Sequence, residues 1–172
     1  MKTIPTAFFI LLIPFVLSAQ KYNTIGGLRI GDDFGISFAQ RIANKSTIEL
    51  NLQPGTFAGR QMTALLVKQH YSLLTKRFNF FMGAGAFSRK IPVSGIDIPQ
   101  QNSSQGLALS FGAELSLGKL SISTDYLPLV TLAKNGSNQL FYTTSGFSLR
   151  YILIGRESGT KKFFKNLFKK KK

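Results

Sequence analysis

The sequence predicts an all-β fold, an eight-stranded antiparallel up-and-down transmembrane β-barrel (a meander) with a basic C-terminal tail. Three observations lead to this prediction. Apolar and polar residues alternate with period two through most of the chain, as in strands with two different faces. No helical period of useful length occurs between residues 21 and 155. The expected connections are mostly short at one end of the strands and longer at the other, as in outer-membrane barrels.

The clearest strand is expected over Gly106–Leu117, where the alternation is unbroken. A transmembrane strand needs about 9–11 residues, so this stretch is long enough to be one. Its apolar face holds Leu107, Leu109, Phe111, Ala113, Leu115 and Leu117, and its other face holds Ala108, Ser110, Gly112, Glu114 and Ser116.

The same alternation predicts the other strands in order. Turns at Asp32-Asp33 and Asn44-Lys45 and a loop at Pro54–Arg60 separate the first four. The expected ranges of these four are Tyr22–Gly31, Phe34–Ile42, Thr47–Gln53 and Gln61–Leu73.

The second half of the chain repeats this arrangement. A turn at Lys76-Arg77 starts the fifth strand, and a long loop over Ser88–Gln105 follows it. A turn at Gly118-Lys119 and a loop at Lys134–Gln139 separate the last three strands. The expected ranges are Phe78–Phe87, Gly106–Leu117, Leu120–Val130 and Leu140–Leu153.

The N-terminus has the pattern of a secretory signal peptide. Lys2 precedes the apolar run Ile4–Leu17, and the small residues Ser18 and Ala19 follow. A retained transmembrane helix is the alternative, but two prolines interrupt the run and it is shorter than the roughly 20 residues of a span. The expected organisation is therefore a signal peptide over 1–19, a barrel domain over 20–155 and a tail over 156–172.

Composition limits the chemistry available to the chain. The 172 residues suffice for one domain, and the lack of cysteine excludes disulfides and thiolate metal sites. With one histidine as well, we expect no metal site and no cofactor. The net charge is +15, but eight basic residues and one acid lie in the last stretch, Arg156–Lys172. Because much of this charge is confined to the tail and the chain is expected to be exported, nucleic acid is not an expected partner.

The polar faces are expected to point into the barrel. They are rich in Gly, Ser, Ala and Asn, which fit the narrow interior of an eight-stranded barrel. Charged groups there are expected to pair, since an unpaired buried charge is costly. The alternative is a secreted, soluble lipocalin-like barrel with its apolar face inside. The expected lumen charge network comprises Arg29, Arg41, Glu49, Lys68, His70, Glu114, Asp125 and Arg150.

Aromatic residues near one end of the strands suggest an interfacial girdle. The expected members are Tyr22, Tyr71, Phe78 and Tyr151.

With its signal peptide and the segments Phe80–Gly85, Phe111–Leu115 and Leu149–Leu153, the chain resembles the small eight-stranded outer-membrane barrels of the OmpA/OmpX type. The resemblance implies a place in the outer membrane of a Gram-negative-type cell, in contact with its lipid. Because side chains fill so narrow a lumen, we expect no open pore and no catalysis. A structural or surface-interaction role would then fall to the extracellular loops, chiefly residues 88–105, with an unknown ligand.

His70 allows one enzymatic alternative. Some barrels of this size modify lipid A with a histidine, a serine and a carboxylate, and Ser72, Lys68 and Glu49 are expected near His70. A histidine bonded within the interior network is the other interpretation, and the expected position of His70 near the periplasmic end favours it.

The tail combines basic residues with apolar ones at helical spacing. Such a segment suits an anionic lipid surface. A disordered, solvated tail is the alternative, because twelve residues form only a marginal helix in water. The residues expected at the membrane surface are Lys161, Lys162, Phe163, Phe164, Lys165, Leu167, Phe168 and Lys169.

Overall fold

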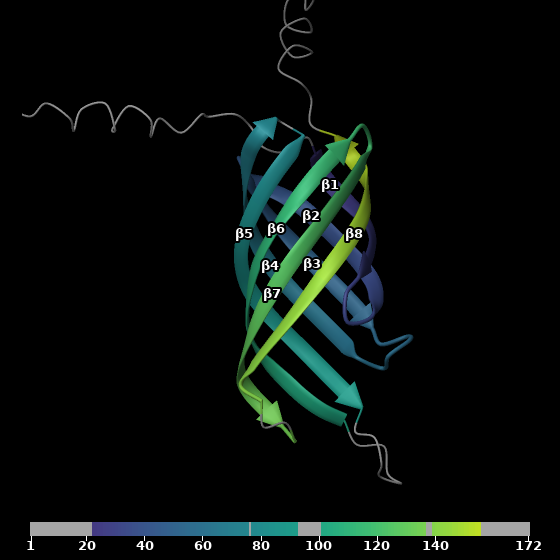
Figure 1. Cartoon of the computed structure of the whole chain (residues 1–172), viewed down its shortest axis with the longest axis vertical. Helices are drawn as coiled ribbons and strands as arrows, with labels where there is room; N and C mark the ends of the chain where they lie inside the picture. The colour runs from purple at the N-terminus through teal and green to yellow at the C-terminus, as the bar shows by residue number, and fades with distance from the viewer. Residues whose placement is uncertain (1–21, 76, 93–100, 137–138, 156–172) are drawn as a thin grey trace, which may run out of the picture.

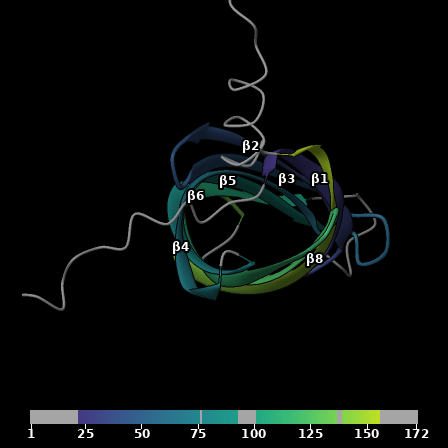
Figure 2. The ribbon, with the colours of Figure 1, turned by 90° about the horizontal axis from the view of Figure 1, so that it is seen from above.

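Eight antiparallel strands close into a barrel in which each strand pairs with the next along the chain. The computed structural model describes residues 22–75, 77–92, 101–136 and 139–155. An antiparallel ladder between the first and last strands closes the ring, which is seen from above in Figure 2. The predicted all-β fold, an eight-stranded antiparallel up-and-down barrel, is confirmed.

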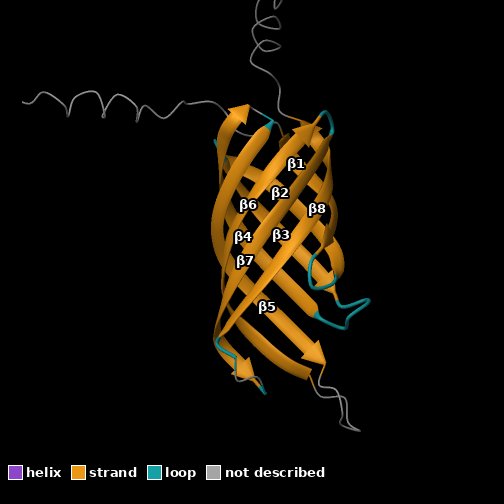
Figure 3. Cartoon of the chain, in the orientation of Figure 1, coloured by secondary structure: helices purple, strands orange, loops and turns teal. Residues whose placement is uncertain are grey.

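Every regular element in the described ranges is a strand (Figure 3). Among these residues, no helix is long and apolar enough to cross a membrane. The strands are β1 (Tyr22–Ile30), β2 (Phe34–Ala43), β3 (Ser46–Pro54), β4 (Gln61–Thr75), β5 (Phe78–Pro92), β6 (Gln101–Leu117), β7 (Leu120–Asn135) and β8 (Phe141–Gly155).

The apolar faces of the strands point outward, away from the lumen. On β4, Leu65 and Val67 are 48% and 50% exposed, whereas Leu66 between them is fully buried. The same alternation continues through the polar Gln69 to the buried His70. A barrel with apolar side chains outside and polar ones inside has the architecture of a membrane barrel.

The two ends of the barrel differ. We call the end with the β2–β3, β4–β5 and β6–β7 connections the turn end, and the opposite end the loop end. β1, β2 and β3 have 9 or 10 residues, whereas the five remaining strands have 15 to 17. The extra residues of β4 lie at the turn end, because β4 continues past Gln69, the partner of Ser46 at the start of β3. At the loop end, β5 to β8 form a wall that extends beyond the β1–β2 and β3–β4 connections (Figure 1).

The wall corrects the predicted loop over Ser88–Gln105. β5 continues to Pro92 and β6 begins at Gln101, with Arg89 paired to Ser104 in the ladder between them. The sequence did not show this because strands that rise beyond an apolar belt no longer need apolar outward residues. For the same reason, β7 continues five residues past the predicted end at Val130.

Candidate functional site

The lumen near the turn end holds a buried cluster of alternating charges. Arg150 on β8 bridges two carboxylates: Nη1 donates to Glu49 at 2.7 Å and Nη2 to Glu114 at 2.9 Å. Lys68 Nζ donates to the other Glu49 oxygen at 2.6 Å, and the Tyr22 hydroxyl donates to Glu114 at 3.0 Å. Strands β1, β3, β4, β6 and β8 are thus joined across the lumen.

A second ion pair lies apart from this cluster. The Arg29 guanidinium on β1 forms a bidentate ion pair with the Asp125 carboxylate on β7. Nη1 donates to Oδ2, and Nη2 donates to Oδ1 at 2.8 Å. Gly146 on β8 makes room for it, since a Cβ there would lie 2.3 Å from Arg29 Nη2. A bidentate pair fixes the distance between the two strands that flank β8.

The two remaining residues of the predicted network lie outside these ion pairs. His70 Nε2 contacts the Thr47 hydroxyl at 3.0 Å, and its ring is tilted against Phe81. Arg41 is half-buried at the turn end, where it donates to the Ala43 carbonyl and to Asn44. With Arg41 at the rim, the interior ion pairs join Arg29, Lys68 and Arg150 to Glu49, Glu114 and Asp125.

Three cations and three anions are therefore balanced in this interior. Removing one member of a buried pair typically costs about 3–5 kcal/mol, because the partner is left as an uncompensated buried charge. Side-chain hydroxyls satisfy further donors: Arg150 Nη2 donates to Ser123 at 2.8 Å. The cluster can hold the strands together, but its groups are engaged with one another.

The loop-end half of the lumen is apolar, which the sequence did not predict. Side chains from β4 to β7 meet there in a buried core, and the half-buried Tyr142 packs against it. Phe87 breaks the alternation of β5, because a large apolar residue stands there on the same inward face as Asn79. The core consists of Met62, Ala64, Leu66, Phe87, Ala108, Leu127 and Leu129.

A polar group lies beside this core at the loop end. Arg89 donates to Asp32 at 2.8 Å, and its guanidinium lies 4.8 Å from the centre of the Tyr142 ring. The Thr144 hydroxyl donates to the other Asp32 oxygen at 2.8 Å. These contacts join β5 and β8 to the β1–β2 turn.

Asp33 joins two connections at the loop end. Its carboxylate accepts from the backbone N–H groups of Phe34, Phe57 and Ala58, at 2.7, 3.1 and 2.9 Å. Burial by itself raises the pKa of Asp33, but backbone N–H donors, including that of Arg60, outweigh it and hold the pKa below its usual value.

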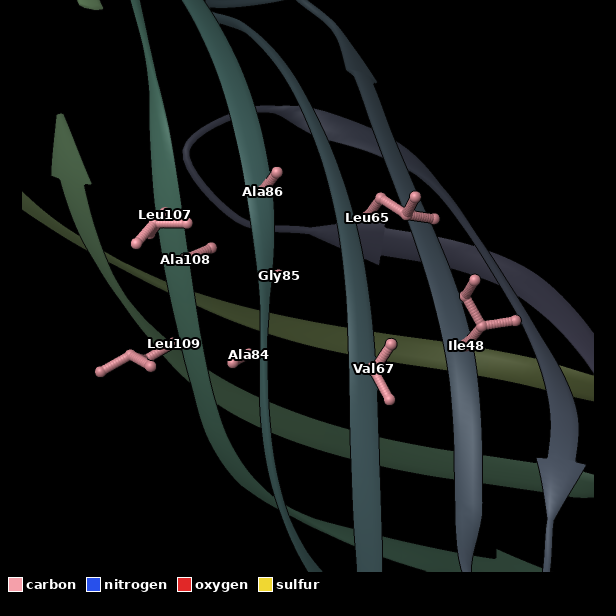
Figure 4. A pocket seen from close by; sticks show the side chains of 9 residues that line it. All are labelled: Ile48, Leu65, Val67, Ala84, Gly85, Ala86, Leu107, Ala108 and Leu109. Carbon is pink, nitrogen blue, oxygen red and sulfur yellow. The ribbon is translucent and has the colours of Figure 1, made fainter. Parts of the chain in front are cut away.

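The outer surface is an apolar belt with a shallow hollow across β3 to β6. Small side chains at Ala84 and Ala86 lie between larger ones on the neighbouring strands, as Figure 4 shows. Hydrocarbon chains of a bilayer would fill such a surface. The hollow is lined by Ile48, Leu65, Val67, Ala84, Gly85, Ala86, Leu107, Ala108 and Leu109.

The predicted aromatic girdle needs one correction. Tyr71 and Tyr151 are 44% and 46% exposed on the outside, and Phe78 is half-buried. Tyr22 instead points into the lumen and is 1% exposed, where its hydroxyl donates to Glu114 Oε2.

The arrangement expected for a lipid A-modifying enzyme is not found around His70. The Ser72 hydroxyl donates to Asn79 rather than contacting the histidine, and Glu49 is bonded to Lys68 and Arg150. His70 itself is 1% exposed. Among the described residues, no group of three or more His, Cys, Asp or Glu side chains converges as a metal site.

Fold and surface together define the class of a small eight-stranded β-barrel with an apolar outer belt. The structure resembles the crystal structure of the N-terminal β-barrel domain of Pseudomonas aeruginosa OprF. The TM-score is 0.56 and the identity 11%, over 77% of this chain and 98% of that domain. This supports an OmpA-like small barrel as the fold. No protein-family model and no curated protein sequence matches the chain.

Two predicted segments lie outside the described residues. These are the signal peptide over 1–19 and the basic tail, with Lys161 to Lys169.

Proposed function

We propose that the protein is an outer-membrane barrel that acts in surface interaction or envelope structure, without an open pore and without catalysis. The outward apolar belt carries the membrane assignment. On β6, Leu107, Leu109 and Phe111 are all exposed while Ser110 and Glu114 are buried. A soluble lipocalin-like barrel would have these faces exchanged.

The protruding β5–β8 wall is the proposed interaction surface. The ladder between β1 and β8 ends at the pair Ile30–Phe147. In the described part of the chain, no strand pairs with Phe141–Gly146 on the β1 side. Backbone groups along a free strand edge can pair with an extended segment of a partner. We therefore propose that the contact lies on the wall and its β8 edge as well as on residues 93–100.

Fractionation tests the membrane assignment. The mature chain should be extracted with detergent from outer membranes and should resist carbonate and high salt. Recovery as a soluble protein without detergent would refute the proposal. Protease treatment of intact cells tests the orientation, since cleavage should occur at the loop end and leave the turn end protected.

The enzymatic alternative has its own test. His70→Ala and Ser72→Ala should leave lipid A acylation in cells unchanged, as measured by mass spectrometry of extracted lipid A. Loss of an acylation product in the His70 variant would favour the enzyme.

A further inference from the structure

Basic residues occupy all three connections at the turn end. Lys45 lies in the β2–β3 turn, Arg77 in the β4–β5 turn and Lys119 in the β6–β7 turn. Arg77 and Lys119 are exposed and Lys45 is half-buried. We call these three residues the basic rim. Arg41 lies beside the first of them but is bonded into its own turn.

The backbone of each rim residue is anchored in the same way. The carbonyl of Lys45 accepts from His70 N–H at 2.7 Å, that of Arg77 from Ser116 N–H at 2.8 Å, and that of Lys119 from Ile152 N–H at 2.7 Å. Each bond reaches beyond the residue's own hairpin to the next strand. The barrel therefore fixes the backbone positions of three basic residues around one end.

Among the described residues, the charged side chains exposed at the turn end are basic. The described acids are Asp32 and Asp33 at the loop end and the three carboxylates of the lumen network.

The basic rim lies at the edge of the apolar belt. Leu117 and Leu120, which flank Gly118-Lys119, are 48% and 46% exposed, and Leu73 and Ile42 near the other turns are also exposed. The apolar surface thus reaches to the turns themselves, unlike the loop end, where the wall rises beyond the belt. In a bilayer this depth is that of the lipid headgroups.

We propose that the basic rim binds the headgroups of anionic phospholipids in the leaflet at the turn end. The proposal rests on the membrane location proposed above. Short turns mark the periplasmic side of outer-membrane barrels, and that leaflet contains phospholipid. Basic side chains next to an anionic lipid surface are attracted to it within about one Debye length, roughly 8 Å at physiological salt.

The test measures lipid preference in vesicles. The full-length mature protein is inserted into phosphatidylcholine vesicles, and the association of spin-labelled phosphatidylglycerol is compared with that of spin-labelled phosphatidylcholine. The triple variant Lys45→Asn, Arg77→Gln, Lys119→Gln should lose about threefold or more of the preference for phosphatidylglycerol. Asn is chosen for Lys45 because that residue has φ of 69°, which Asn tolerates. High salt should reduce the wild-type preference towards that of the variant.

A matched variant removes three charges from the loop end instead: Arg60→Gln, Lys90→Gln, Lys134→Gln. It should keep the wild-type preference, and both variants carry the same tail. Equal losses in the two variants, or no loss in the first, would overturn the proposal. Failure of the wild-type protein to insert would count against the membrane location itself, and circular dichroism of the inserted variants verifies that they fold.

Discussion

Asp33 shows how one side chain can fix two loops. Its carboxylate accepts hydrogen bonds from its own turn and from the β3–β4 connection, and the Phe34 and Phe57 rings meet edge to face across the same gap. Because the bonds favour the charged form, its pKa is lowered. The stabilisation is thus complete above the unfolded pKa of about 3.9 and is lost as the pH falls through the lower folded value.

We therefore expect the amides of Phe57 and Ala58 to lose protection at acid pH. Hydrogen exchange, normalised for intrinsic rates, would measure this. In Asp33→Asn the amide side chain cannot take a charge, so protection should be lower at neutral pH and its dependence on carboxyl titration should disappear. Equal protection in wild type and variant at neutral pH would contradict the role given to Asp33.

Gly146 is a second residue with a definable role. A methyl group there would lie 2.3 Å from the Arg29 guanidinium and would displace it from Asp125. Overpacking of this kind costs about 1–3 kcal/mol, and loss of the ion pair would add to it. Gly146→Ala should therefore lower the urea midpoint of unfolding in vesicles. The control is Gly155→Ala, because a Cβ at Gly155 would meet nothing within 4 Å.

At the scale of elements, periodicity predicted the existence and faces of all eight strands but not their lengths. A lipid-facing strand must alternate, so Leu107 to Leu117 is easily recognised. Beyond the belt water surrounds both faces, and Ser103 or Lys90 fits a strand as well as a loop. This is why the predicted loop over Ser88–Gln105 was too long.

The interior was predictable in composition but not in pairing. Sequence alternation indicates that Glu49 and Arg150 point inward, yet they meet only because the barrel closes and its stagger brings β3 and β8 to the same depth. Tyr22 could not be distinguished from an interfacial tyrosine, since either position suits a ring with a hydroxyl. The apolar core around Leu66 and Leu127 was missed because the inner faces were expected to be polar.

The β5–β6 extension should be separable from the barrel. Replacing residues 90–103 by Asn-Gly would join Arg89 and Ser104, which are already paired, through a two-residue turn. The ion pairs and the apolar core lie outside the removed segment, so urea unfolding in vesicles should change by no more than about 1 kcal/mol. Any surface binding should be lost. Failure of this variant to fold would show that the extension contributes to assembly.

At the scale of the whole molecule, two separate groups of side chains occupy the lumen. The charge cluster fills the turn-end half, and an apolar core fills the loop-end half. The two groups share no residue, and the core contains no charged side chain. We therefore expect the charge cluster to contribute mainly to stability, and either group of side chains to suffice to exclude ions.

Arg150→Ala tests this directly, since it removes the cation shared by Glu49 and Glu114. We expect a loss of about 3–5 kcal/mol in unfolding free energy, because two carboxylates would keep only Lys68 as a cationic partner nearby. Planar bilayer recordings should nevertheless show no steps of conductance, because the apolar core stays in place.

A second variant, Leu66→Ser with Leu127→Ser, leaves the ion pairs intact and should also not conduct. Only the combination of all three substitutions should open a path for ions. Conductance in Arg150→Ala alone would show that the charge cluster is the barrier and that the apolar core is permeable.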